Sequence, residues 1–140
     1  MTQRGMTPQP PPTIVVGYIP NELGAAAVRT AIAEARLRGG FVHVVNASRG
    51  ESYVDRHLAD ADELNELDRL LSDSGVPHQV VQRVGLAEPA AEILDAARET
   101  SAVLVVIGLR HRTPVGKLLL GSTAQRILLD APCPVLAVKA

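Results

Sequence analysis

Segments with strand-like and helix-like patterns alternate along almost the whole of this 140-residue chain. Short apolar runs, such as 13–18 and 102–107, are separated by segments whose apolar residues recur every three or four positions, as in an amphipathic helix. Strands and helices in this alternation form parallel sheets with right-handed helical crossovers. The sequence therefore predicts a Rossmann-like α/β fold, a three-layer, doubly wound sheet of five mainly parallel strands with helices on both faces.

The expected elements follow one another with short connections. The strands are expected at 13–18, 41–45, 78–84, 102–107 and 134–138. Four helices are expected. The first spans about 22–37, the second follows a loose region at 46–54, the third starts at Pro89, and the fourth spans about 122–129. Ligands of such sheets bind at the carboxyl ends of the strands, near the point where the strand order reverses. If it reverses between the first and fourth strands, Gly17, Tyr18 and Ile19 lie beside Gly108.

Composition narrows the class of protein. Hydrophobic residues make up 46% of the chain and aromatic residues 2%, so the core must be aliphatic, as in a parallel sheet covered by helices. The lack of aromatic side chains argues against single-stranded nucleic acids, which bind by stacking, and a net charge of -1 supplies no general attraction to polyanions. We expect one domain, 13–140, after a disordered tail, 1–12, rich in Pro, Gln and Thr.

Cysteine, histidine and hydropathy patterns favour a cytoplasmic protein without a metal site. Cys133 is the single cysteine, so no internal disulfide is possible, and it is expected to be packed rather than reactive. No apolar run approaches the roughly 18 residues of a membrane span, and the N-terminus lacks the blocks of a signal peptide. No histidine pair has metal-ligand spacing. His43, within an apolar run, is expected to be a core or rim histidine with its hydrogen bonds satisfied.

The segment 108–123 is the clearest candidate for a ligand-binding loop. An apolar run leads to Gly108, a basic stretch follows, and 121–123, Gly-Ser-Thr, open the last expected helix. The span 100–129 contains no Asp or Glu, and its basic residues are Arg110, Arg112, Lys117 and Arg126. Exposed amides at a helix start, hydroxyl side chains and nearby cations suit a bound phosphate.

Two familiar phosphate motifs do not fit this loop. Walker A needs Gly-Lys followed by Ser or Thr, whereas Leu118 follows Gly116 and Lys117 here. The dinucleotide fingerprint needs a glycine-rich turn after the first strand, where this chain has Tyr-Ile-Pro-Asn at 18–21. The loop instead has Gly108 and Gly121 thirteen positions apart.

This spacing resembles the nucleotide signature of the universal stress protein family, which is Gly, two residues, Gly, nine residues, then Gly-Ser or Gly-Thr. The chain has Gly108, His111 at the second glycine position, and Gly121-Ser122 after nine more residues. The flanks, Val-Val-Ile-Gly and Ala-Pro-Cys-Pro-Val-Leu-Ala-Val-Lys, are also similar to the family. The resemblance covers roughly 13–140 and implies the adenine nucleotide alpha hydrolase-like version of the fold.

The resemblance implies a role for each matching residue. Gly108 and Gly121 would let the backbone approach the phosphates. Ser122 and Thr123 would offer them amides and hydroxyls. Val44 would lie beside the base. Together with the end of the first strand, these residues make up most of a candidate nucleotide site.

The chain departs from the family pattern at two of its site positions. Where ATP-binding members have an Asp that holds the nucleoside, this chain has Ile19, although backbone groups of Gly17 and Ile19 could partly replace it. Losing one charge-assisted hydrogen bond costs about 1.5–3 kcal/mol. His111 either restricts the loop, adds a donor toward phosphate, or is a solvated loop histidine. Arg110 and Arg112 either clamp phosphate oxygens or serve surface solubility.

Three functions follow from these residues. The leading one is a stress-response regulator that binds an adenine nucleotide, ATP, with or without Mg²⁺, and hydrolyses it slowly at most, because the loop has no general base. The alternative is a nucleotide-independent, dimeric protein–protein interaction module. A nucleotide-dependent transferase is a third. For assembly, we expect a homodimer paired through 134–138, because an apolar edge strand needs cover and the resemblance implies such dimers.

Overall fold

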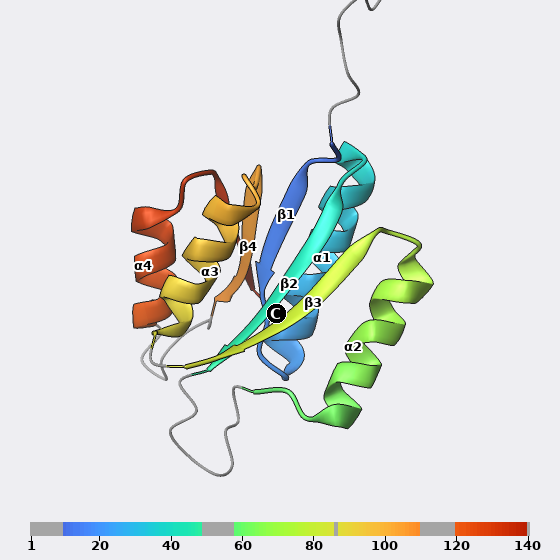
Figure 1. The fold of residues 1–140 in the computed structure, drawn as a ribbon, viewed down its shortest axis with the longest axis horizontal. Coiled ribbons are helices and arrows are strands. Elements are labelled where there is room, and N and C mark those ends of the chain that lie inside the picture. The colour runs from blue at the N-terminus through green and yellow to red at the C-terminus, as the bar shows by residue number, and fades with distance from the viewer. Residues whose placement is uncertain (1–9, 49–57, 86, 110–119, 140) are drawn as a thin grey trace, which may run out of the picture.

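A computed structural model describes residues 10–48, 58–85, 87–109 and 120–139, and within them strands and helices alternate without exception (Figure 1). The elements are β1 Thr13–Gly17, α1 Glu22–Arg38, β2 Phe41–Ser48, α2 Ala61–Ser74, β3 His78–Val84, α3 Pro89–Glu99, β4 Leu104–Leu109, α4 Ser122–Asp130 and β5 Val135–Lys139. All strand pairs are parallel, and the strand order is β3-β2-β1-β4-β5. The predicted fold class is confirmed, and the strand order reverses between β1 and β4 as the site prediction required.

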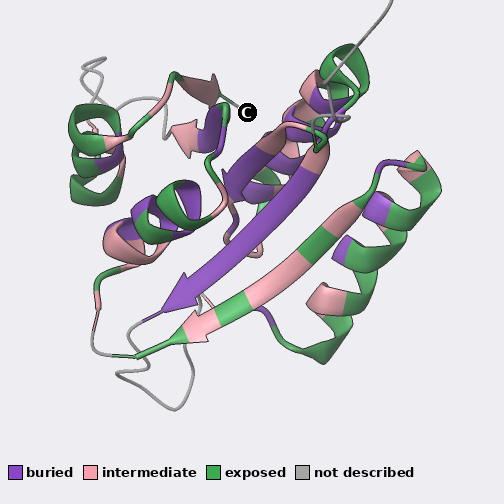
Figure 2. Cartoon of the chain, turned by 45° about the horizontal axis from the view of Figure 1, so that its top comes forward, coloured by how far each residue is buried: buried purple, intermediate pink, exposed green. Residues whose placement is uncertain are grey.

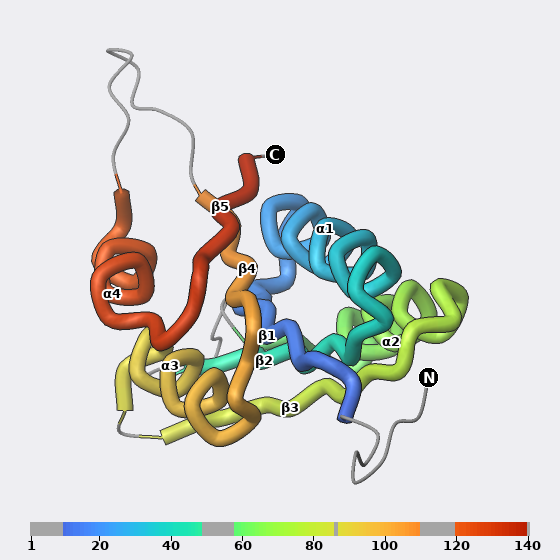
Figure 3. Tube along the Cα trace, turned by 90° about the horizontal axis from the view of Figure 1, so that it is seen from above, coloured from blue at the N-terminus to red at the C-terminus, as the bar shows by residue number. Residues whose placement is uncertain are grey.

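Helices cover both faces of the sheet (Figure 3). One core cluster joins the strands to α1 and α2 through residues such as Val28, Ile32 and Leu71. The other joins them to α3 and α4 through Ile93 and Ile127. The central strands are buried on both faces, whereas β3, at one edge of the sheet, alternates between half-buried and exposed residues (Figure 2). This is the three-layer arrangement that the aliphatic core predicts.

Local sequence signals set where the helices begin and end. Asn21 caps α1, because its side chain accepts a hydrogen bond from the Gly24 amide. The α1 helix ends at Gly39, whose φ of 62° lies in the left-handed region that glycine adopts without strain. Gly75 ends α2 in the same way, and Pro89 occupies the first turn of α3. The bounds of α1 and the start of α3 agree with the expected helix at about 22–37 and the expected helix start at Pro89.

Two strands differ from the prediction by more than one residue at an end. β2 continues to Ser48, although 46–48 were expected to be loose, because its last residues pair with β3 as far as Val84. β4 starts at Leu104 rather than 102 and runs through Gly108 to Leu109, because these two residues pair with Val138 and Lys139 of β5. Gly108 therefore lies inside the strand and does not end it.

The division into a tail, 1–12, and one domain, 13–140, stays a prediction. Most of the expected tail and residues 49–54 of the expected loose region lie outside the described residues. In the portions of the chain that are described, no helix is both long and apolar enough to cross a membrane.

Candidate functional site

A cavity of about 330 Å³ opens at the carboxyl ends of the central strands, where the strand order reverses. Its wall is built from the ends of β1, β2 and β4 and the first turns of α1, α3 and α4. The lining residues are Gly17, Tyr18, Ile19, Leu23, Gly24, Val45, Ala47, Pro89, Ile93, Ile107, Gly108, Leu109, Gly121, Thr123, Ala124 and Ile127. The cavity occupies the place in the fold at which doubly wound proteins bind their ligands.

Glycines on the two central strands keep the walls close to the sheet. A Cβ atom on Gly17 would lie 2.8 Å from Cδ1 of Ile93, and one on Gly108 would lie 2.5 Å from Cγ of Leu23. Real Cβ atoms do not come so close to another carbon, so a side chain at either position would force the Ile93 or Leu23 side chain to move. The two glycines thus shape the cavity by lacking side chains.

Three helices begin at the cavity, and their first turns differ in how they are capped. The α1 amide of Gly24 is already bound by Asn21. The N-cap residue of α4 is Gly121, which has no side chain that could form a cap hydrogen bond. The first turn of α4, which includes Thr123, therefore presents backbone amides and the positive end of the helix dipole to the cavity. Both features suit a bound phosphate.

Most of the predicted site residues come together here. Gly17, Tyr18, Ile19, Gly108, Gly121 and Thr123 all line the cavity, and Ser122 is the exposed first residue of α4. Arg110 and His111 lie outside the described residues, so the structure leaves their predicted roles open.

Val44 is not brought to the cavity. Its side chain is fully buried in the cluster under α1 and α2, on the other face of the sheet. Val45 lines the cavity instead, because it pairs with Gly17 in the β1–β2 register and shares its face. Val45, and not the predicted Val44, therefore contributes to the wall of the cavity.

The apolar wall was missed by sequence reasoning. Ile93 from α3, Ile107 from β4 and Ile127 from α4 line the cavity together with Val45 and Ala47. All belong to the α3–α4 core cluster, so they read as ordinary core residues in the sequence. These residues line one cavity only because of how the helices pack on the sheet, and a single sequence does not indicate that packing.

Backbone groups near Ile19 are held in place rather than free. The Tyr18 amide donates to the Val45 carbonyl at 2.9 Å, and the Tyr18 carbonyl accepts from Nδ2 of Asn46 at 2.9 Å. The Ile19 carbonyl accepts from the Asn21 amide at 2.8 Å. No described lining residue is charged. The end of β1 therefore offers a rigid, largely apolar surface where a carboxylate would otherwise hold a nucleoside.

Tyr18 contributes packing to the site more than chemistry. Its side chain is buried in the cluster under α1 and α2. Burial, with smaller effects of Glu63 and Glu66, raises the pKa of Tyr18 and keeps the phenol neutral. Elsewhere in the described residues, no three His, Cys, Asp or Glu side chains are grouped so that they could hold a metal ion.

Comparisons with known proteins agree with this geometry. The sequence profile of the universal stress protein family matches residues 12–139. A universal stress protein of Mycolicibacterium smegmatis is 50% identical over 126 residues, which are 90% of this chain and 96% of that protein.

Solved structures from Archaeoglobus fulgidus are similar as well. One universal stress protein has a TM-score of 0.69 and 32% identity over 91% of this chain and 98% of its own. A second, described in complex with dAMP, has a TM-score of 0.61 and 28% identity over 91% of this chain and 97% of its own. From its fold, its loop spacing and these relatives, this chain belongs to the universal stress protein family.

Proposed function

We propose that this protein binds an adenine nucleotide, ATP, in the cavity at the ends of β1, β2 and β4, and that it acts as a regulator in a stress response. The observation that carries the proposal is that an apolar wall lies next to the start of α4, whose N-cap residue, Gly121, has no side chain to cap the helix. The wall suits a base, and the helix start suits phosphates. The relative from A. fulgidus, described in complex with dAMP, supports the same ligand class.

The residues divide into two halves of one site. Val45, Ala47 and Ile93 would pack against the base and sugar, and Gly17 leaves the space for them. Gly121, Ser122 and Thr123 would meet the phosphates, with Mg²⁺ held by the phosphates themselves. Because no described lining residue carries a carboxylate or an imidazole, hydrolysis would be slow at most.

Calorimetric titration with ATP and Mg²⁺ tests the proposal. We expect one site per chain and a dissociation constant in the micromolar range, weaker than a site with an acid at Ile19 would give. No heat up to high micromolar ligand would contradict it. Adenosine serves as the control that separates binding by the apolar wall from binding by the helix start.

A second candidate function is a nucleotide-independent interaction module. Ile19 favours it, since an apolar side chain stands where the nucleoside would be held. Chromatography of the denatured, freshly purified protein separates the two functions. Stoichiometric nucleotide in the supernatant supports the first and excludes the second.

We further propose that the protein is a cytoplasmic homodimer paired through β5. β5 lies at the edge of the sheet, its apolar residues are half-buried, and Leu128 and Leu129 on the adjacent α4 are 41% and 82% exposed. An apolar edge needs a partner strand. Light scattering at micromolar concentration should give twice the chain mass of 14.8 kDa, and a monomer would rule the dimer out.

A further inference from the structure

An ion pair joins the start of α3 to the middle of α4. The Nη1 atom of Arg126, on α4, lies 3.2 Å from Oε2 of Glu88, the residue before α3. Each is flanked by residues that line the cavity, since Pro89 follows Glu88, and Ala124 and Ile127 lie close to Arg126 on α4. Neither side chain lines the cavity itself, and the pair connects the two helices, α3 and α4, that supply part of its wall.

Glu88 does not serve its own helix as an N-cap residue commonly does. Such a side chain usually accepts a hydrogen bond from the second or third amide of its helix. Glu88 makes no side-chain cap hydrogen bond with α3, and its carboxylate reaches Arg126 on α4 instead. Its negative charge is thus directed across the space between the two helices.

Arg126 has a second acidic neighbour on the side away from the helix start. Its Nε atom lies 3.8 Å from Oδ2 of Asp130, one turn further along α4. The guanidinium can turn from Glu88 toward an anion at the start of α4 while Asp130 still balances part of its charge. Arg is the residue best suited to such an exchange, because its planar fork binds carboxylate and phosphate alike.

We propose that Glu88 and Arg126 set how strongly the cavity prefers highly charged ligands, with the phosphates competing with Glu88 for Arg126. This inference rests on the proposed function in that it places the phosphates at the start of α4. The Glu88 carboxylate repels each added phosphate, and the Arg126 guanidinium attracts it. The pair is a specificity determinant, distinct from the glycines and apolar residues that hold the base.

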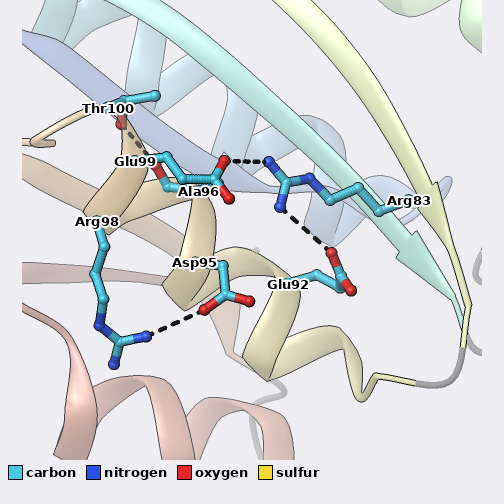
Figure 4. A network of polar contacts seen from close by, with 7 residues as sticks. All are labelled: Arg83, Glu92, Asp95, Ala96, Arg98, Glu99 and Thr100. Atoms are coloured by element: carbon cyan, nitrogen blue, oxygen red, sulfur yellow. Dashed lines mark hydrogen bonds and ion pairs between the residues drawn. The ribbon is translucent and has the colours of Figure 1, made fainter.

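The test compares two variants at the pair with two matched controls. Glu88→Gln and Arg126→Gln each remove one charge beside the cavity. Asp95→Asn and Arg98→Gln remove the same charges from an ion pair of 3.3 Å on α3 whose side chains are similarly exposed (Figure 4). The four proteins and the wild type are titrated by calorimetry at low salt with adenosine, AMP, ATP and inorganic tripolyphosphate.

Glu88→Gln should strengthen ATP binding about three- to tenfold and Arg126→Gln should weaken it by a similar factor, since one unit charge acts on several phosphates at short range. The change for AMP should be smaller, and adenosine should bind all five proteins alike. Both effects should shrink at 0.5 M salt, and the controls should match the wild type. Thermal unfolding confirms that each variant is folded.

The outcomes separate this inference from the proposed function. If adenosine and ATP bind but Glu88→Gln and Arg126→Gln leave the ATP-to-adenosine ratio unchanged, the charge-selectivity inference is overturned and nucleotide binding stands. If only tripolyphosphate binds, and Glu88→Gln and Arg126→Gln change its affinity as expected, the charge-selectivity inference is supported and adenine recognition is excluded. If neither ATP nor tripolyphosphate binds any of the folded proteins, both are overturned.

Discussion

The Cδ1 atom of Ile93 lies 2.8 Å from the point that a Cβ atom on Gly17 would occupy. Gly17 ends β1 and Ile93 belongs to the second turn of α3, and both line the cavity. The Ile93 side chain therefore occupies the space that a side chain on Gly17 would need, and the cavity beside them is the proposed binding site. A substitution at Gly17 should therefore affect ligand binding in the cavity more than it affects the stability of the fold.

Gly17→Ala should weaken ATP binding at least about tenfold, because the end of the Ile93 side chain must turn away from the new methyl group and toward the cavity. The end of an isoleucine side chain rotates easily, so the free energy of unfolding should fall by only about 1 kcal/mol. Titration and urea unfolding measure the two effects. Unchanged ATP affinity in a folded variant would show that this wall does not contact the ligand.

Gly24→Ala is the matched contrast to Gly17→Ala. A Cβ atom at Gly24 would lie 1.9 Å from the carbonyl oxygen of Ile19, which is backbone and cannot rotate aside. We expect a loss of stability of about 3 kcal/mol or more, in place of the gain that Gly-to-Ala gives inside an ordinary helix. Urea unfolding that shows no loss would mean that the 19–24 turn adapts more easily than its packing implies.

Asn46→Leu should lower the free energy of unfolding by about 2–5 kcal/mol, because buried polar groups lose their partners. The fully buried Asn46 side chain donates to the Tyr18 carbonyl at 2.9 Å and accepts from the Ala59 amide at 2.8 Å. It also accepts from Nε2 of Gln82 at 3.0 Å. Gln82→Leu, at an exposed position with fewer hydrogen bonds, should cost less, and the reverse order in urea unfolding would contradict this account.

His43 should make the protein less stable in mild acid. The side chain is 6% exposed, and its Nε2 atom has no hydrogen-bond partner among the described residues, so the expectation that its hydrogen bonds are satisfied was wrong. Burial, and then the nearby Arg83, lowers the pKa of His43, although Glu99 opposes this. Arg83 is held close by Glu92 at 3.4 Å and Glu99 at 2.8 Å (Figure 4).

The sign follows from the lowered pKa. The folded protein keeps His43 neutral, whereas the unfolded chain takes up a proton near the usual value of about 6.5. The stabilisation is present above pH 6.5 and is lost as the pH falls from there toward the folded pKa, by at most about 1.4 kcal/mol per pH unit. Urea midpoints between pH 7.5 and 5.5 measure this slope, and His43→Gln should flatten it. Equal slopes in both proteins would exclude His43 as its source.

Cys133 should react slowly with thiol reagents in the folded protein. It is partly buried and packs against the α3–α4 cluster, and burial raises the pKa of its thiol. Since the thiolate is the reactive form, alkylation at pH 8 should be about tenfold slower than in the urea-unfolded chain. Equal rates would mean that Cys133 is not packed as described.

Much of the fold follows from local signals in the sequence. Asn21, Gly39, Gly75 and Pro89 mark helix ends by their own conformational preferences, and the structure has helix ends at each of them. The apolar runs between them predict parallel strands because both faces must be buried. The glycines of the site could also be predicted from local sequence, because they are identified by their spacing in one loop and by their place at the end of one strand.

The rest depends on contacts between distant segments. Val44 and Val45 differ only in which face of β2 they occupy, and a one-residue error in assigning a face exchanges the cavity wall for the opposite core. β2 extends through Asn46 because partners far along the chain satisfy its polar side chain. The pair of Glu88 and Arg126 spans 38 residues, so neither one alone signals the other.

Nuclear magnetic resonance of the backbone amides during an ATP titration tests the binding site most directly. Gly17, Gly24, Gly108 and Gly121 line the cavity, whereas Gly39 and Gly75 end α1 and α2 just before β2 and β3 begin, at the opposite ends of the strands. We expect ATP to shift the amide signals of the four glycines that line the cavity and to leave the amide signals of Gly39 and Gly75 unchanged. Saturating ATP that shifts none of the four, or shifts only Gly39 and Gly75, would contradict it.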